Sequence, residues 1–171
     1  PESYEKIEAA KRASTSGRRD AIDAWLRFYQ RQNGTPPTSA LTTELSRYNQ
    51  YFLERIVENL APRLKTGVPV RLWSAGSGID SVSLRLKAIY GDAIEITVSD
   101  VARECILANR RMFEENGLSA NFVVADLFRD VYRDAFDIVY NTGLLEHFQR
   151  TEQETLLRIF SDSLRWGGVY L

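Results

Sequence analysis

The sequence predicts an α/β protein with a doubly wound, mainly parallel sheet, preceded by a helical N-terminal segment. Three observations lead to this prediction. From Val68 onward, short hydrophobic runs alternate with helical patterns, as they do in parallel sheets. The first run ends in the turn Gly76-Ser77-Gly78, which leads into a helical stretch. The next two runs end in Asp100 and Asp126, so polar residues follow successive strands.

Residues 1–66 are expected to form the helical N-terminal segment. Apolar residues recur at helical spacing on both sides of a Gly- and Pro-containing break at residues 33–39. They are Ala21, Ile22, Trp25, Leu26 and Tyr29 before the break, and Leu41, Leu45, Tyr48, Phe52, Ile56 and Leu60 after it. We expect this segment to be separate from an α/β domain over residues 67–171, and it could serve as a lid or a substrate element.

The predicted strands follow one another with helical connections. They are Val70–Ser74, Ile94–Ser99, Asn121–Ala125, Phe136–Tyr140 and the start of a fifth strand at Val169–Leu171. The first connecting helix is expected to begin after an N-cap at Asp80 and to end at Gly91. The second spans 101–116, with Val101, Cys105, Ala108 and Met112 facing inward.

The connection from the third strand to the fourth contains only a short helical or turn segment at residues 127–132. The last helix is expected to begin at a capping box of Thr151 and Glu154 and to reach Arg165. Trp73 and Trp166 are interpreted as core or turn packing. These elements complete the expected doubly wound arrangement.

Composition excludes several classes of function. The net charge of −1 does not favour general nucleic-acid or membrane-surface binding, and no apolar run is long enough to span a bilayer. A single cysteine, Cys105, permits no intramolecular disulfide and favours a reducing, cytoplasmic setting. One histidine, one cysteine and scattered acids predict no metal site.

The strand ends point to a nucleoside ligand. Open α/β sheets bind ligands outside the carboxyl ends of their strands. Asp100 could accept hydrogen bonds from ribose hydroxyls, and Asp126 could accept one from an exocyclic amine such as adenine N6. Either aspartate alone fits an N-cap or turn role equally well. Together with the glycine turn, the two favour a nucleoside site.

From about Val68 to Leu171 the chain resembles the class I S-adenosylmethionine-dependent methyltransferases. The matching segments, in order, are residues 75–78, Asp100, residues 124–127, 136–141, 144–148 and 164–168. The resemblance implies S-adenosylmethionine as the cofactor and in-line displacement at its sulfonium methyl group. The acceptor stays unknown, either a small molecule or a protein side chain.

The resemblance also implies roles for single residues. Eight of them would bind the cofactor: Ser74, Gly76, Gly78, Asp100, Val101, Asp126, Leu127 and Asn141. The first three would line the methionine and ribose portion, Asp100 would bind the ribose hydroxyls, and Val101 would touch the adenine face. Asp126 would meet adenine N6 beside Leu127, and the backbone of Asn141 would lie near the methionyl ammonium.

Catalytic residues are not assigned by the resemblance, because a sulfonium is already an excellent leaving group and positioning is the main requirement. His147 and Glu146 are candidates from their place after the fourth strand, although His147 fits a packing or capping role as well. Leu72 stands where many members of the family carry an acid. The family's sheet also continues past strand five, so we expect the missing strands to come from the rest of a longer parent chain.

Two other classes of function stay open. Gly76-x-Gly78-x-x-Ser81 is one residue from a dinucleotide-binding fingerprint, which would suit an NAD-dependent oxidoreductase. The leucine at position 72 and the missing strands would suit a non-catalytic or regulatory methyltransferase-like domain. Within the methyltransferases, residues 71–76 are similar to the first motif of chemotaxis-receptor glutamate methyltransferases, whereas residues 144–148 are more like those of small-molecule enzymes.

Overall fold

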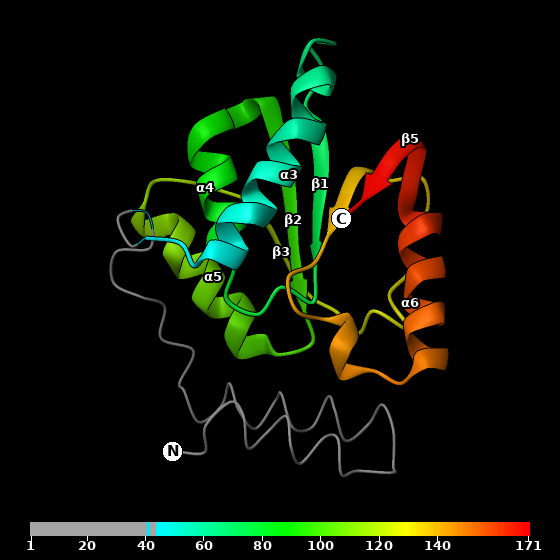
Figure 1. The fold of residues 1–171 in the computed structure, drawn as a ribbon. Helices are drawn as coiled ribbons and strands as arrows, with labels where there is room; N and C mark the ends of the chain where they lie inside the picture. The colour runs from blue at the N-terminus through cyan, green and yellow to red at the C-terminus, as the bar shows by residue number, and fades with distance from the viewer. Residues whose placement is uncertain (1–40, 42–43) are drawn as a thin grey trace.

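Five parallel strands form the sheet at the centre of the protein in the computed structural model, which describes residue 41 and residues 44–171 (Figure 1). The strands are β1 (Val70–Ala75), β2 (Ile94–Asp100), β3 (Asn121–Val124), β4 (Phe136–Tyr140) and β5 (Leu164–Tyr170). They lie in the order β3-β2-β1-β4-β5. The chain therefore runs outward from β1 in one direction and from β4 in the other, which confirms the predicted doubly wound sheet.

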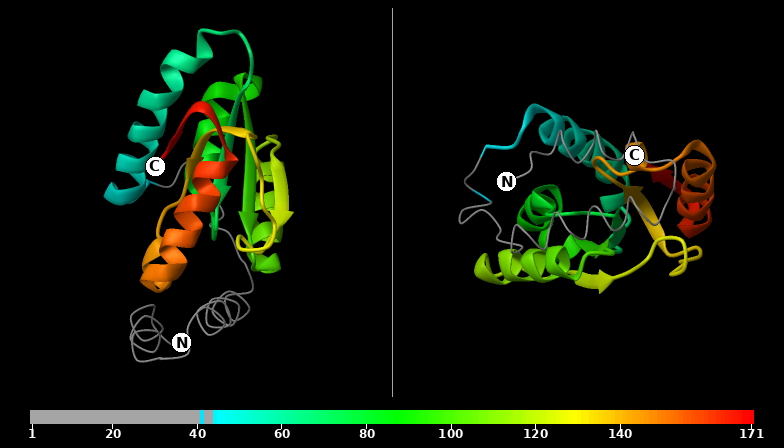
Figure 2. Two further views of the ribbon diagram at one scale, coloured as in Figure 1. Left: turned by 90° about the vertical axis from the view of Figure 1, so that its right-hand side faces the viewer. Right: turned by 90° about the horizontal axis from the view of Figure 1, so that it is seen from below.

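Helices cover both faces of this sheet (Figures 1 and 2). The helices are α3 (Arg47–Leu64), α4 (Ser81–Tyr90), α5 (Arg103–Glu115) and α6 (Arg150–Ser163), with short 3₁₀ turns η1 (Gly91–Ala93) and η2 (Leu145–His147). Alternate residues of β1 point to opposite faces. Leu72 packs in the cluster that α3, α4 and α5 share, and Trp73 packs with α6.

The start and end of α4 follow the sequence prediction. The Asp80 carboxylate accepts a hydrogen bond from the Ser83 amide at 2.8 Å, as an N-cap does. Gly91, with a φ of +51°, ends the helix in a conformation that residues with a Cβ rarely adopt. Asp80 and Gly91 therefore fix where α4 begins and ends. Because the glycine turn leads directly into Asp80, the N-cap also fixes where that turn ends.

The predicted start of the last helix is wrong by one half-turn. The helix begins at Arg150, after Gln149, and the Glu152 carboxylate accepts a hydrogen bond from the Gln149 amide at 3.0 Å. Thr151 lies inside the first turn and does not pair with Glu154 as a capping box. Glutamine is not among the usual N-cap residues, which is why the true cap escaped the sequence pattern.

Strand β5 begins at Leu164, earlier than the predicted Val169, and the last helix ends before Arg165. Its pairing with β4 shifts register after Leu164, so the residues up to Gly168 bulge out of the ladder. Gly167 in the bulge has a φ of +76°, and its carbonyl accepts a hydrogen bond from Arg63 of α3 at 2.6 Å. Trp166 is fully exposed on this bulge, so its predicted packing role is wrong, whereas Trp73 is fully buried.

Helix α3 packs onto the sheet as part of the main hydrophobic core. Ile56 and Leu60 are fully buried in one cluster with residues of β1, β2, α4 and β4. The described part of the N-terminal segment is therefore built into the α/β core, and the boundary at residue 66 stays a prediction. The expected helical face at residues 21–29 lies outside the described residues. No helix in the described part of the chain is long and apolar enough to cross a membrane.

Replacing Leu60 with alanine tests whether α3 belongs to the core. We expect Leu60→Ala to lower the free energy of unfolding by about 2–5 kcal/mol, because the deletion leaves a cavity under the helix. Leu157→Ala, at a leucine of α6 that is 42% exposed, should cost less than about 1 kcal/mol. Urea denaturation of both variants is the measurement, and equal costs would contradict the packing of α3.

Candidate functional site

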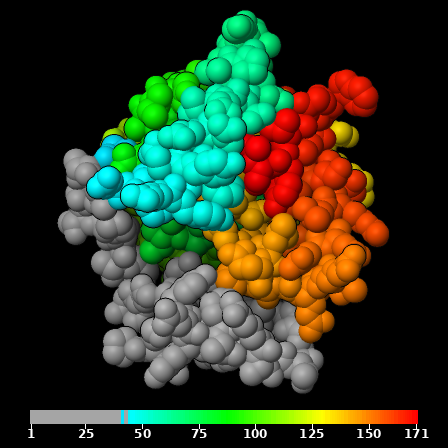
Figure 3. Space-filling view, in the orientation of Figure 1, coloured from blue at the N-terminus to red at the C-terminus, as the bar shows by residue number. Residues whose placement is uncertain are grey.

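A cavity of about 380 Å³ lies at the carboxyl ends of β1, β2, β3 and β4. This is where the strand order reverses between β1 and β4, the usual ligand position in open α/β sheets. Helix α3 and the segment after β4 form its other side, and Figure 3 shows the two next to each other in cyan and orange. The described lining residues are Tyr48, Asn49, Gly76, Ser77, Gly78, Ile79, Asp100, Val101, Ala125, Asp126, Leu127, Phe128, Thr142, Gly143, Leu144, Glu146, His147 and Phe148.

The cavity brings together most of the predicted site residues. Gly76, Gly78, Asp100, Val101, Asp126 and Leu127 line it, and so do both catalytic candidates, Glu146 and His147. Ser74 and Asn141 are buried but are not among the lining residues. The Ser74 hydroxyl donates to the Asp80 carboxylate at 2.6 Å, and the Asn141 side-chain amide donates to the Tyr170 hydroxyl at 2.6 Å. These two side chains therefore support the wall of the cavity from behind.

The turn between β1 and α4 requires glycine at position 76. Gly76 has a φ of +60°, in the region that disfavours any side chain. A Cβ at this position would also lie 2.5 Å from Cδ1 of Leu144, which packs over the turn. The sequence therefore allows the segment after β4 to approach the bare backbone of the turn closely.

Asp100 fixes this turn to the end of β2. One carboxylate oxygen accepts a hydrogen bond from the Gly78 amide at 2.8 Å, and the other accepts one from the Ala102 amide at 2.8 Å. Burial raises the pKa of Asp100 above its ordinary value, and these backbone hydrogen bonds oppose the rise. Each carboxylate oxygen has a second lone pair, so Asp100 can still accept hydrogen bonds from a ligand in the cavity.

Asn109 of α5 holds the same turn from the opposite side. Its side-chain amide donates to the Gly78 carbonyl at 2.7 Å, and its side-chain oxygen accepts from the Asp80 amide at 2.8 Å. Asn109 is fully buried. The sequence reasoning missed this residue, although a polar side chain on the helix face of Cys105, Ala108 and Met112 was an available signal.

Asp80 is the centre of a second buried polar network, on the α4 side of the turn. Its carboxylate accepts from the hydroxyls of Ser74 and Ser83 and from the Ser83 amide, and the Ser83 hydroxyl also contacts the Tyr140 hydroxyl. Burial raises the pKa of Asp80, while these hydrogen bonds oppose the rise. Leu72, which replaces an acid common in the resembling family, is fully buried among apolar residues. The buried carboxylate near the turn is therefore Asp80, the N-cap of α4, and β1 itself carries none.

The predicted adenine side of the cavity follows β3. Asp126 also takes a turn role, because one of its carboxylate oxygens accepts from the Phe128 amide at 3.0 Å. The other oxygen lies 3.6 Å from the guanidinium of the exposed Arg129. Leu127 is buried beside it, and Phe128 makes an edge-on ring contact with Phe148 across a centroid distance of 5.4 Å. The turn role and a ligand-binding role are thus compatible at Asp126.

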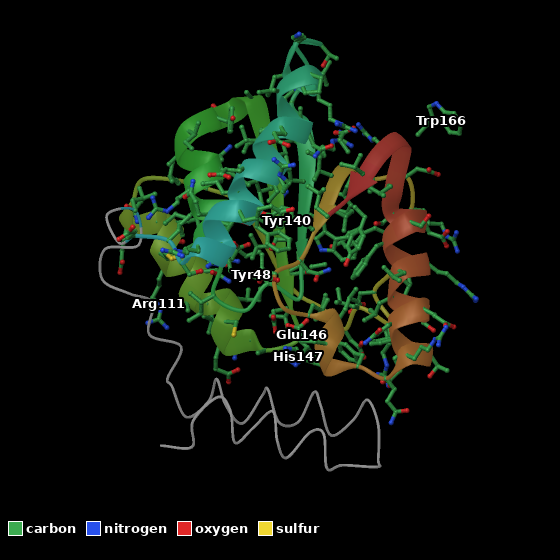
Figure 4. All side chains as sticks on the ribbon, in the orientation of Figure 1. Tyr48, Arg111, Tyr140, Glu146, His147 and Trp166 are labelled. Atoms are coloured by element: carbon green, nitrogen blue, oxygen red, sulfur yellow. The ribbon has the colours of Figure 1, made fainter. Side chains whose placement is uncertain are left out.

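The opposite end of the cavity is formed by α3 and η2 (Figure 4). Tyr48 comes from the first turn of α3, and Glu146 and His147 come from η2. Tyr48 and Glu146 both line the cavity, and partial burial together with the charge of Glu146 raises the pKa of the Tyr48 hydroxyl. Glu146 Oε1 would lie 3.2 Å from a Cβ at Gly143, so the carboxylate stands against bare backbone. No cluster of metal-ligating residues occurs among the residues that the structure describes.

Comparison with known families identifies the chain. A family model described as a methyltransferase domain matches residues 74–168, which is more than half of the sequence. The protein belongs to this methyltransferase-domain family. The match begins at the end of β1 and includes every predicted site residue. No curated protein matches the sequence.

Solved structures share the fold of this methyltransferase domain. A S-adenosylmethionine-dependent methyltransferase from Clostridium acetobutylicum has a TM-score of 0.59 at 15% identity, over 85% of this chain and 55% of that one. Magnesium protoporphyrin IX methyltransferase from Synechocystis, with bound S-adenosylmethionine, has a TM-score of 0.53 at 16% identity, over 73% and 62%. The [4+2]-cyclase SpnF has a TM-score of 0.56 at 26% identity, over 68% and 42%. The chain thus spans about two fifths to three fifths of these proteins.

The pH dependence of stability tests the buried state of Asp80. Because burial raises its pKa in the folded protein, protonated Asp80 stabilises the fold at low pH, and that contribution is lost as pH rises from about 3.8 through the folded pKa. Asp80→Asn cannot titrate there, so its deficit in unfolding free energy should be largest at acid pH and should shrink toward neutrality. At neutral pH the free energy of unfolding of Asp80→Asn should still be about 1–3 kcal/mol below that of the wild type, because buried hydrogen bonds are lost.

The measurement is urea denaturation of the wild type and Asp80→Asn at several pH values. Asp92→Asn is the matched control, because the side chain of Asp92 is fully exposed beside Lys87. Its difference from the wild type should be small at every pH. A deficit in Asp80→Asn that grows as pH rises would contradict the assigned environment of Asp80.

Proposed function

We propose that this methyltransferase domain binds S-adenosylmethionine in the cavity at the strand ends and transfers its methyl group to an acceptor by in-line displacement. The observation that carries the proposal is the arrangement of Asp100 and the glycine turn. A buried carboxylate with spare lone pairs lies beside the bare backbone of Gly76 and Gly78, at the point where the strand order reverses.

The residues present fit the cofactor. Asp100 would accept hydrogen bonds from the ribose hydroxyls, and Gly76 and Gly78 would let the nucleoside and methionine portions approach the backbone. Val101 and Leu127 would contact the adenine ring, with Asp126 accepting from its exocyclic amine. Ser74 and Asn141 would act from behind the wall, because they reach Asp80 and Tyr170.

The cofactor, once bound, supplies a methyl group on a positively charged sulfur that departs as a neutral thioether. The chain's own task is to hold the acceptor in line and to exclude water from the reacting atoms. Leu144, packed over Gly76, and the ring pair of Phe128 and Phe148 supply apolar surface for this task. Glu146 and His147 stay catalytic candidates, and we propose a cytoplasmic setting, in keeping with the buried thiol of Cys105.

Other functions on the same fold are kept as alternatives. The third glycine of a dinucleotide fingerprint is absent, since Ser81 is the first residue of α4, and this disfavours an NAD-dependent oxidoreductase. One structural neighbour, SpnF, is by name a cyclase, which illustrates that a shared fold does not fix the reaction. A non-catalytic domain also fits the fold, so cofactor binding and methyl transfer need separate tests.

Calorimetric titration with S-adenosylhomocysteine tests the cofactor site. We expect binding by the wild type and a loss of about 10- to 100-fold in affinity for Asp100→Asn, because hydrogen bonds to a charged acceptor contribute about 1.5–3 kcal/mol. Asp100→Ala should lose at least as much.

Asp162→Asn is the control, since Asp162 is half-exposed on α6 and pairs with Arg133 away from the cavity. It should bind like the wild type. Equal affinity of Asp100→Asn and the wild type, or tighter binding of NAD than of S-adenosylhomocysteine, would overturn the proposed function.

A further inference from the structure

The charged side chains among the described lining residues of the cavity are all carboxylates. Asp100, Asp126 and Glu146 contribute carboxylates, and none of the described lining residues is a lysine or an arginine. Asp100 and Asp126 lie at the strand ends, on the side proposed for the nucleoside. Glu146 belongs to η2, and it is the one carboxylate of the described lining that has no role in the proposed cofactor contacts.

The end of the cavity proposed for the acceptor carries one aromatic side chain of α3 and one carboxylate of η2. Tyr48 is 53% exposed and Glu146 is exposed, so both can be reached from solvent. The aromatic pair of Phe128 and Phe148 lines the same cavity. Behind them, the Tyr170 hydroxyl is held by the Asn141 side chain at 2.6 Å. Figure 4 shows Tyr48 on α3 and Glu146 on η2, at the same end of the sheet.

The electrostatic environment agrees with this placement. Burial raises the pKa of Tyr170, and the charges of Glu146 and Tyr48 raise it further while the hydrogen bond from Asn141 opposes the rise. Burial and the charge of Glu146 likewise raise the pKa of Tyr48. Deprotonating either tyrosine beside this carboxylate is therefore unfavourable, and both phenols stay neutral at physiological pH. The negative charge at this end is carried by Glu146.

We propose that the methyl acceptor is a basic amine, which Glu146 and the aromatic surface of Tyr48 select. This inference rests on the proposed function. A protonated amine would be attracted by the carboxylate and by the faces of the aromatic rings. An acceptor carboxylate or phosphate would instead be repelled by Glu146, and no lysine or arginine among the described lining residues could pair with it.

The chemistry of an amine acceptor balances at this site. The ammonium first gives up one proton, to the Glu146 carboxylate or to the water that reaches it. The free nitrogen lone pair then forms the new N–CH₃ bond while the C–S bond breaks and its electron pair goes to sulfur. The products are a methylated ammonium and neutral S-adenosylhomocysteine. The exposed position of Glu146 gives the released proton a route to solvent.

Three probes with one aromatic body and different head groups test the proposal: 2-phenylethylamine, 2-phenylethanol and 3-phenylpropionate. Their binding is measured by calorimetry, with and without saturating S-adenosylhomocysteine. We expect the amine to bind at least about fivefold more tightly than the alcohol, and the carboxylate to bind most weakly. Glu146→Gln should cut the affinity for the amine by about three- to fivefold and leave the alcohol unchanged, as expected for a solvent-exposed charge.

Glu154→Gln is the matched control, because Glu154 is an exposed glutamate of α6 that pairs with Arg150 and does not line the cavity. It should preserve the preference for the amine. Tighter or equal binding of the carboxylate or the alcohol, an unchanged preference in Glu146→Gln, or no binding of any probe would each overturn the amine proposal. Failure of S-adenosylhomocysteine to bind would instead overturn the proposed function, since the head-group preference is also measured without it.

Discussion

The site depends on the hydrogen bond between the Gly78 amide and the Asp100 carboxylate. This bond joins the turn after β1 to the end of β2, and Asn109 holds the same turn from α5. The turn therefore has little freedom, although two of its residues are glycines with positive φ. A rigid turn of bare backbone can bind a nucleoside without first paying the entropy of ordering itself. The fold therefore preorganises the turn for the proposed cofactor.

The same aspartate carries a structural and a proposed ligand-binding role. Burial of Asp100 raises its pKa, and the amides of Gly78 and Ala102 offset part of the cost of keeping the carboxylate charged. Asp80 repeats this design on the other side of the turn with the hydroxyls of Ser74 and Ser83. The carboxylates of Asp80 and Asp100 thus hold the two sides of one short turn. Leu72 has no part in these hydrogen bonds and packs in the hydrophobic core.

The sequence predicted the doubly wound sheet and the approximate positions of its strands, and most of the predicted site residues line the cavity. Periodicity and the residues at strand ends are local signals, so they can be read from the sequence alone. Asp100 and Gly76 were found in this way. Asn109 was missed, and Tyr48 was placed only in a helical segment that could serve as a lid or a substrate element. Their positions at the site depend on where α5 and α3 pack, which no local pattern reports. The cap at Gln149 and the bulge around Gly167 also escaped, because neither uses the residue type or spacing that normally marks such a feature.

The central claim is that Asp100 accepts hydrogen bonds from the cofactor's ribose, beyond its role in fixing the turn. The most direct measurement compares the affinities of S-adenosylhomocysteine and its 2′-deoxyribosyl analogue for the wild type and for Asp100→Asn. The account predicts that the wild type loses about tenfold in affinity on removal of the hydroxyl, whereas Asp100→Asn loses much less. An equal loss in both proteins would show that Asp100 only holds the turn, and would contradict the account.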